Sequence, residues 1–234
     1  MSVDEDSNRH LPLAVVAIDF GTTYTGYAYS SRNEFQKSKS NCAGIINHNN
    51  WASGFAGLYS FKAPTVALFN SEKEFDCFGY EAEDKYARLA ENKVHHKWYY
   101  FSRFKMQLFD KMKLSRDFAI ADQLGKCLPA IDVFSESIKY LAKAAKKEFV
   151  NAGQDNLVSD IIWVITVPAI WNEPAKQFMR QAAIKAGIDK DNLMLALEPE
   201  AAALYCRYLP GKEANDIRSY FHGGRYMVVD MGGK

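Results

Sequence analysis

The same short pattern stands at both ends of this 234-residue chain. An apolar run is followed by an aspartate, one further residue, and then glycine with small residues, once at residues 14–24 and again at residues 226–234. Apolar runs without alternation are typical of strands buried on both faces, and glycine with small residues favours a tight turn. Each copy therefore predicts a buried strand that delivers one carboxylate, Asp19 or Asp230, to a turn. Two copies predict the two sides of one phosphate clamp.

The first turn has the chemistry that phosphate binding needs. Backbone N–H groups in a tight turn are good donors to phosphate, Gly21 allows a close approach, and Thr22 and Thr23 add hydroxyl groups. Asp19 would repel a phosphate unless a divalent cation lay between them, and Mg²⁺ accepts carboxylates through its retained waters. We therefore predict that Asp19 and Asp230 hold a hydrated magnesium ion from opposite sides. The alternative is that each aspartate only caps its own turn.

Composition limits the class of protein. Hydrophobic residues make up 48% and charged residues 24% of the chain, as in a soluble globular protein. The net charge of +1 favours neither nucleic acid nor an acidic membrane as a partner. The first twelve residues lack the order of a signal peptide and the apolar runs are too short for a membrane helix, so we expect a cytoplasmic or nuclear protein. Reduced thiols are expected at all four cysteines, which lack metal or redox spacing: Cys42, Cys77, Cys127 and Cys206.

The pattern along the chain predicts an α/β fold. Strands are expected at residues 13–20, 24–30, 64–69, 74–78, 161–167, 192–197 and 226–229, and helices at residues 81–91, 131–150, 171–187 and 201–208. The first phosphate motif then lies on a hairpin turn between two strands. Strands and helices alternate after residue 130, which implies a layer with parallel pairing.

The helix at residues 131–150 is the clearest of these elements. Its apolar residues recur at spacings of three and four and form one stripe: Ile131, Phe134, Ile138, Leu141, Ala145 and Phe149. Lys143 lies off this stripe. In the next helix Asn172 is the expected N-cap and Pro174 stands in the first turn.

The domain division follows from where the pattern is irregular. Residues 1–12 are polar and are expected to be a disordered N-terminus. Residues 13–40 and 129–234 carry the regular pattern and are predicted to form the core of one lobe. Residues 41–128 are predicted to form a small inserted α+β subdomain.

Further motifs resemble a known family. Phe20 follows the first aspartate and Glu200 follows Pro199, and three segments have a characteristic order and spacing: Trp163–Trp171, Leu197–Ala203 and Asp230–Gly233. Together with the first motif they resemble the actin-like ATPase domain of the 70-kDa heat-shock protein family, most closely its heat-shock 70-kDa protein 12 subfamily (types A and B). The resemblance covers residues 13–233 and implies a ribonuclease H-like first lobe with a small inserted subdomain.

The resemblance implies ATP or ADP and Mg²⁺ as ligands. The residues that match its phosphate loops are Gly21, Thr22, Thr23 and Tyr24 in the first loop, and Gly232 and Gly233 in the second. Asp19 and Asp230 match the aspartates that hold the metal through water and take part in catalysis.

The resemblance also implies roles for four residues between the loops. Lys105 matches the lysine that positions the attacking water and offsets charge on the γ-phosphate, and Glu198 matches an acid near the water shell of the metal. Pro168 matches an allosteric switch proline and Lys176 a basic relay residue. Taken alone, Lys105 would instead be read as a solvated charge with a packed stem. Glu198 alone would be read as an acid at a helix N-terminus, and Pro168 and Lys176 as a strand end and a surface charge.

The sequence departs from the family at its end. The second loop of the family continues with a third glycine, a threonine and an aspartate, whereas Lys234 follows Gly233 here. We therefore expect a chain truncated to the first lobe, without the adenosine-binding residues of the second. Such a chain would bind nucleotide weakly and would be an incomplete catalyst.

Three function classes follow. The first is a fragment of a chaperone-type, stress-response ATPase, with nucleotide and with client proteins or co-chaperones as partners. The second is a non-catalytic interaction module that uses the face between the lobes. The third is a sugar or acetate kinase of the same fold, although no sugar-binding segment is recognisable.

Two other candidate sites are weak. His95 and His96 are adjacent, so their side chains are expected to point apart, and no partner has ligand spacing. Cys206 follows Glu198 on a predicted helix and is expected to be a packed thiol rather than a nucleophile.

Overall fold

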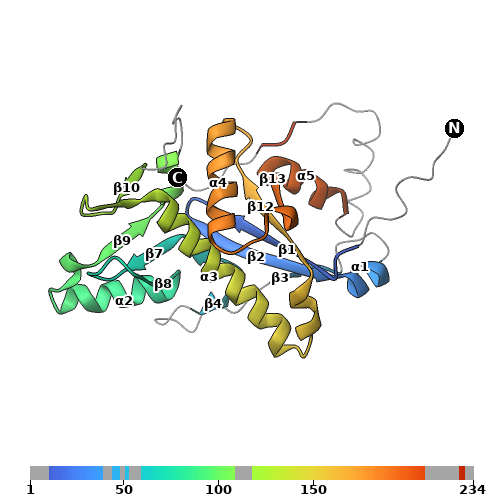
Figure 1. Ribbon diagram of the computed structural model, residues 1–234, viewed down its shortest axis with the longest axis horizontal. Helices are drawn as coiled ribbons and strands as arrows, with labels where there is room; N and C mark the ends of the chain where they lie inside the picture. Colours follow the sequence, from blue (N-terminus) through green and yellow to red (C-terminus); the bar gives the residue numbers. More distant parts are fainter. Residues whose placement is uncertain are drawn as a thin grey trace.

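A mixed sheet forms the centre of the computed structural model, which describes residues 11–38, 44–47, 51–52, 59–108, 118–208 and 227–229. The sheet has six strands in the order β13-β12-β1-β2-β3, with β6 paired to β2 (Figure 1). Its strands are β1 (Ala14–Phe20), β2 (Tyr24–Ser31), β3 (Ile46–Asn47), β6 (Ala63–Pro64), β12 (Ile161–Val167) and β13 (Leu193–Leu197). The predicted α/β class is confirmed.

The pairing of these strands agrees with the sequence pattern. β1 and β2 form an antiparallel hairpin in which Asp19 lies opposite Gly26. β12 runs parallel to β1 on its other side, and β13 runs parallel to β12. Both the hairpin around the first motif and the parallel layer after residue 130 are therefore confirmed.

The two faces of β1 differ, so the prediction that this strand is buried on both faces is wrong. Val16, Ile18 and Phe20 are fully buried, whereas Val15 is 36% exposed. The buried face packs on the helix that contains Phe134. The ring centroids of Phe20 and Phe134 lie 5.7 Å apart. The opposite face has less cover, and it carries the side chain of Asp19, which is 41% exposed.

Two helices cover the buried face. They are α3 (Ala130–Asn151) and α4 (Glu173–Lys185), and Figure 1 shows α3 running obliquely across the sheet beside α4. The predicted stripe of α3 is confirmed because five of its members are fully buried: Phe134, Ile138, Leu141, Ala145 and Phe149. The predicted N-cap of α4 is also confirmed, since the side chain of Asn172 accepts a hydrogen bond from the backbone N–H of Ala175 at 3.0 Å.

A smaller sheet lies beside the first, at the left of Figure 1. Its order is β8-β7-β9, and the 12-residue helix α2 packs against β7 and β8. The bounds are β7 (Val66–Phe69), β8 (Phe75–Phe78), α2 (Tyr80–Glu91) and β9 (Tyr99–Ser102). Two short ribbons complete the described strands: β4 (Trp51–Ala52) with β5 (Tyr59–Ser60), and β10 (Ala119–Ala121) with β11 (Cys127–Pro129).

The segment predicted as an insertion is joined to the main sheet. Both β3 and β6 fall within residues 41–128 and pair with β2. The predicted strand at residues 64–69 is divided into β6, which pairs with β2, and β7, which pairs with β8 and β9. The helix α1 (Arg32–Ser38), which follows β2 directly, was not predicted. The division into domains itself stays a prediction.

The C-terminal part differs from expectation in two places. α5 (Glu198–Tyr208) begins three residues before the predicted start, so that Glu198 is its first residue. Of the strand predicted at residues 226–229, the structure describes residues 227–229 and assigns no strand to them. Met227 is 84% exposed and Val229 is 60% exposed, so their apolar side chains gain no burial that would stabilise a strand.

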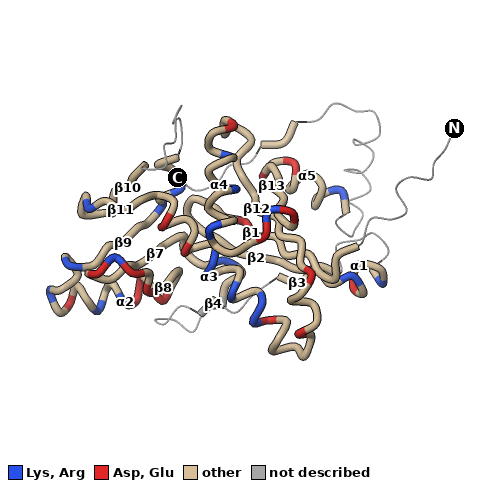
Figure 2. The backbone as a smooth tube through the Cα atoms, in the orientation of Figure 1, with Lys and Arg blue, Asp and Glu red and all other residues tan. Residues whose placement is uncertain are grey.

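Charge is mixed over the described chain. Figure 2 shows acidic and basic residues interspersed along α2 and α3 alike. Among the residues that the structure describes, no helix is long and apolar enough to cross a membrane.

Candidate nucleotide-phosphate site

The turn after β1 is built around Gly21. A Cβ atom at this position would lie 2.1 Å from the carbonyl oxygen of Tyr24, so a side chain does not fit without moving the turn. Thr65 holds the turn from outside: its hydroxyl donates to the carbonyl of Gly21 at 2.8 Å, and its backbone N–H donates to the carbonyl of Thr23 at 2.8 Å. Because that hydroxyl proton is used, Thr25 donates to Thr65 Oγ1 across 2.7 Å. The turn is therefore tied to the strand segment that precedes β7.

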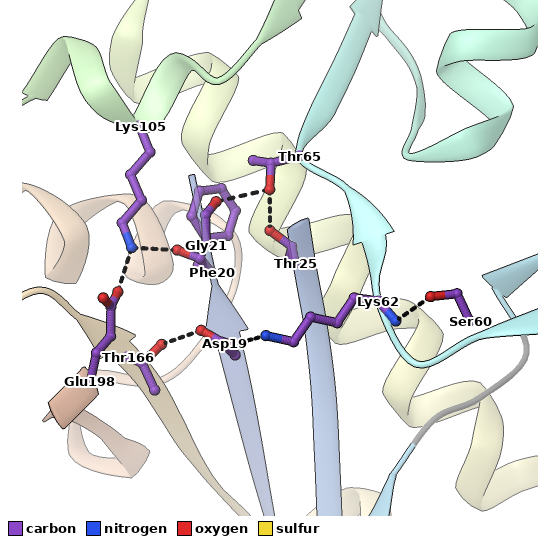
Figure 3. A network of polar contacts seen from close by, with 10 residues as sticks. All are labelled: Asp19, Phe20, Gly21, Thr25, Ser60, Lys62, Thr65, Lys105, Thr166 and Glu198. Atoms are coloured by element: carbon purple, nitrogen blue, oxygen red, sulfur yellow. Dashed lines mark hydrogen bonds and ion pairs between the residues drawn. The ribbon is translucent and has the colours of Figure 1, made fainter. Parts of the chain in front are cut away.

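Asp19 lies at the end of β1 between two partners. Its Oδ1 accepts a hydrogen bond from the hydroxyl of Thr166 at 3.0 Å, and its Oδ2 lies 2.5 Å from the ammonium of Lys62. Figure 3 shows the three side chains in a row across the ends of β12, β1 and β2. Asp19 thus has an ion pair and is more than a cap of its own turn.

Lys105 contacts the residue directly before the Gly21 turn. It lies in a 3₁₀ helix (Phe104–Leu108), and its side chain is only 2% exposed. Its ammonium donates to the carbonyl of Phe20 at 2.5 Å and lies 2.6 Å from Oε1 of Glu198. The ring of Trp171 lies 5.3 Å from the same nitrogen, a favourable distance for a cation–π contact.

The burial of Lys105 excludes one interpretation of this residue, the solvated charge, and its catalytic role stays a prediction. A solvated charge on a packed stem would leave its ammonium in water, whereas here the carbonyl, the carboxylate and the indole surround it. Glu198 is both the first residue of α5, where an acid is favoured by the helix dipole, and the partner of this lysine. The structure therefore brings Asp19, Gly21, Lys105 and Glu198 together (Figure 3).

Other predicted site residues are placed differently. Tyr24 is 51% exposed at the start of β2, and Thr22 and Thr23 form the turn before it. Lys176 lies on α4 and pairs with Glu173 at 2.9 Å, and among the described residues no hydrogen bond or ion pair joins it to Asp19 or Lys105. Pro168 directly follows β12, and its carbonyl accepts from the backbone N–H of Trp171. Asp230, Gly232 and Gly233 lie outside the described residues.

The structure also places the histidine pair and the cysteines. His95 and His96 lie in one 3₁₀ helix, and no cluster of three His, Cys, Asp or Glu residues that could hold a metal ion occurs in the described part of the chain. Cys77, Cys127 and Cys206 are free thiols, as expected. Burial, with a smaller contribution from Asp76, raises the pKa of the Cys77 thiol, so this residue is a packed thiol and no nucleophile at neutral pH.

Three residues of the site were missed by sequence reasoning: Lys62, Thr65 and Thr166. Lys62 and Thr65 flank a proline before a short strand, and Thr166 lies within an apolar strand. Nothing in these local patterns distinguishes them from ordinary polar residues. Their partners lie 40 or more positions away in the chain, so only the folded structure brings them together.

The residues present fit a phosphate better than they fit a metal ion. The glycine turn and its threonines are suitable for phosphate oxygens, and Lys105 donates to the carbonyl of Phe20 directly before it, while Lys62 pairs with Asp19. The carboxylates of Asp19 and Glu198 each already have a lysine partner. Among the described residues no unpaired carboxylate at the turn is available to a magnesium ion.

Comparisons with known proteins give three results. No protein-family model matches the chain. Human heat shock 70 kDa protein 12A is 42% identical over 214 residues, which is 88% of this chain and 30% of that protein. Human heat shock 70 kDa protein 12B is 37% identical over 215 residues, or 90% of this chain and 30% of that protein. The chain thus spans 30% of the length of these relatives.

Among solved structures, MreB5 of Spiroplasma citri bound to ADP aligns with 81% of this chain and with 40% of the MreB5 chain. The sequence identity is 12% and the TM-score is 0.43.

Proposed function

The chain is a relative of the heat-shock 70-kDa protein 12 proteins, and on that premise we propose that it is a nucleotide-binding fragment of a chaperone-type ATPase. The phosphates of ATP or ADP bind at the turn of residues 21–24. One observation carries this proposal: Asp19, Lys62, Lys105 and Glu198 meet at a turn that has no room for a side chain at Gly21.

The position of the site in the sheet supports the same function. Asp19, Thr166 and Glu198 stand at or directly after the carboxyl ends of the parallel strands β1, β12 and β13. In open α/β sheets, ligands bind in the crevice outside these ends. The buried Lys105 holds a fixed positive charge one hydrogen bond from the residue before the turn, where it attracts phosphate.

Each residue then has a defined task in binding. The turn donates to phosphate oxygens, Lys105 fixes the carbonyl of Phe20 and thereby the start of the turn, and Glu198 fixes Lys105. A magnesium ion, when bound, would supply further positive charge to the phosphates. Complete ATP hydrolysis, client proteins and co-chaperones are proposed only for a protein as long as the human 12A relative, 30% of which this chain spans.

A titration of the ¹⁵N-labelled chain with ADP, ATP and adenosine tests the proposal. ADP and ATP should shift the amide signals of residues 19–25, with a Kd of about 1 mM or weaker because one phosphate loop supplies the contacts. Adenosine alone should leave these signals in place. Gly21→Ala should weaken ADP binding by about tenfold, since its Cβ atom displaces the carbonyl of Tyr24.

Two outcomes would contradict the proposal. Equal shifts with adenosine and ADP would place the nucleotide contacts elsewhere. A Gly21→Ala variant that keeps its fold and its ADP affinity would show that the turn does not bind phosphate. A screen of small-molecule phosphoryl acceptors separates the kinase alternative, because a kinase would transfer phosphate to one of them.

A second function, a protein-interaction module, is favoured by the exposed apolar surface of α5. None of the described residues of α5 is buried, and Leu204 and Tyr205 are 56% and 48% exposed. Met194 on the neighbouring β13 is 58% exposed. Exposed apolar side chains are typical of protein interaction sites where they form one patch.

The expected result for this surface is concentration-dependent association in analytical ultracentrifugation. Leu204→Lys should reduce the association, because it places a charge in the apolar surface. Ile184→Lys is the matched control, since Ile184 is 46% exposed on α4 and should tolerate the charge. A chain that stays monomeric at high concentration, or that responds equally to both changes, would remove this function and leave nucleotide binding in place.

A further inference from the structure

The side chain of Lys62 pairs with the carboxylate that the sequence predicts to hold a magnesium ion. Its ammonium lies 2.5 Å from Oδ2 of Asp19, the carboxylate predicted to hold the metal through water. The side chains of Lys62 and Asp19 are 50% and 41% exposed, so the pair is accessible to a ligand. No motif or resemblance pointed to Lys62.

The structure makes room for this lysine at a glycine. Gly26 lies opposite Asp19 in the hairpin, and in an antiparallel pair such residues present their side chains to the same face. A Cβ atom on Gly26 would lie 3.1 Å from Cγ of Lys62 and 2.8 Å from the carbonyl oxygen of Phe61. Figure 3 shows the lysine side chain crossing β2 to reach β1. The missing side chain of Gly26 is what leaves this path open.

The backbone on either side fixes where the lysine starts. Ala63, the next residue, is paired with Thr25 in the main sheet. On the other side, the backbone N–H of Lys62 donates to the hydroxyl of Ser60 at 3.2 Å. The direction of the lysine toward Asp19 therefore follows from strand pairing.

The donors of Lys62 suit a bridge between a carboxylate and a phosphate. An ammonium group has three N–H donors, and the described contacts use one of them on Asp19. The turn of residues 21–24 begins two residues after Asp19 in the chain. A phosphate bound at that turn would be repelled by the Asp19 carboxylate unless a positive charge lay between them, and the ammonium supplies that charge.

We propose that Lys62 is a tethered cation that stands between Asp19 and the nucleotide phosphates, so that this site binds ATP and ADP without requiring a divalent metal ion. The inference rests on the proposed nucleotide function. It adds a phosphate-binding residue and a consequence: metal ions and the lysine ammonium compete for the same carboxylate.

The first experiment measures ADP and ATP affinity by ¹⁵N NMR titration, once with excess magnesium and once with EDTA. In the wild-type chain the two affinities should agree within about threefold, because the lysine supplies the charge. Lys62→Met should lose about tenfold or more in metal-free affinity, the magnitude of one charged hydrogen bond. Magnesium should restore a large part of that affinity in the variant, since Asp19 is then open to the ion.

The second experiment needs no nucleotide. Manganese(II) is added to the free chain, and paramagnetic broadening of the amide signals of residues 19–26 is recorded. The wild-type chain should show little broadening, while Lys62→Met should show clear local broadening that disappears in Lys62→Met/Asp19→Asn. Gly26→Val should act like Lys62→Met, because its side chain blocks the path of the lysine.

The matched control is Lys85→Met. Lys85 also pairs with an aspartate, Asp76, at 2.6 Å, with exposed fractions of 42% and 22%, in the smaller sheet. Its loss should change neither the magnesium dependence of ADP binding nor the manganese broadening near Asp19. Retained folding of every variant is checked by the dispersion of the same spectra.

The outcomes separate the two proposals. Wild-type ADP binding that requires magnesium, or equal manganese broadening in the wild-type chain and in Lys62→Met, would overturn the role of Lys62 and leave the phosphate site standing. A wild-type chain that binds neither ADP nor ATP under both conditions would overturn the proposed function and the phosphate contact of Lys62 with it.

Discussion

Replacing Ile138 by aspartate should lower the free energy of unfolding by about 4 kcal/mol, enough to unfold a large share of the protein. Ile138 lies in the middle of α3 and is fully buried in the main core, together with Phe20 and Ile18 of β1. A carboxylate at this position would be buried without a partner. Chemical denaturation followed by circular dichroism measures the loss.

Lys143→Asp is the control on the same helix. Lys143 is exposed and lies off the buried stripe, so the change should stay within about 0.5 kcal/mol. Similar losses for the two variants would show that α3 does not pack on the sheet with the face described here.

The success with α3 shows which parts of this fold the sequence could predict. Phe134, Ile138 and Phe149 are set by a local period of three to four residues, and burial of one helix face is a direct consequence of that period. The hairpin after β1 was predictable for a similar reason, because the apolar run and Gly21 specify a strand and a tight turn within a few residues. Both the helix period and the strand–turn pattern are set by residues that are close together in the sequence.

The partners within the site could not be predicted in this way. Lys62, Thr166 and Glu198 have contacts 43, 147 and 93 positions away, and their neighbours in sequence carry no trace of those contacts. Lys105 lies in an irregular 3₁₀ segment, where no periodicity reports burial. The chemistry of the turn was therefore predictable and the resemblance pointed to Lys105 and Glu198, while Lys62 and the two ion pairs became known from the tertiary structure.

The burial of β1 was mispredicted for a related reason. An apolar run without alternation reports the hydrophobicity of both faces, but the actual cover depends on which helices pack there. α3 covers the face of Phe20, while Val15 and Asp19 stay partly exposed on the other face. That open face is where the carboxylate is accessible to Lys62.

The second large effect is expected at the buried pair of Lys105 and Glu198. Glu198→Gln leaves the ammonium of Lys105, which is 2% exposed, without an opposite charge, and should cost about 3 kcal/mol. Lys105→Met leaves the Glu198 carboxylate, which is 22% exposed, and the carbonyl of Phe20 without their donor. Water can reach Glu198 in part, so this loss should be smaller, about 2 kcal/mol.

A double-mutant cycle turns this difference into a test of the pair. In Lys105→Met/Glu198→Gln no charge is left buried alone, so the double variant should be more stable than the sum of the single losses predicts, by about 2 kcal/mol. The exposed pair of Lys176 and Glu173, with exposed fractions of 26% and 85%, provides the comparison. Its cycle should give a coupling of about 0.5 kcal/mol or less, because solvent screens both charges.

The same variants should also report on the turn through the amide signal of Gly21. Lys105 donates to the carbonyl of Phe20, which shares a peptide group with the N–H of Gly21. Lys105→Met should therefore shift that signal strongly, while Lys176→Met leaves it unchanged. An additive cycle together with an unmoved Gly21 signal would mean that Lys105 lies in solvent and that the charge beside the phosphate turn is absent. Strong coupling with a shifted signal would instead show that stability and the geometry of the turn depend on the same ammonium group.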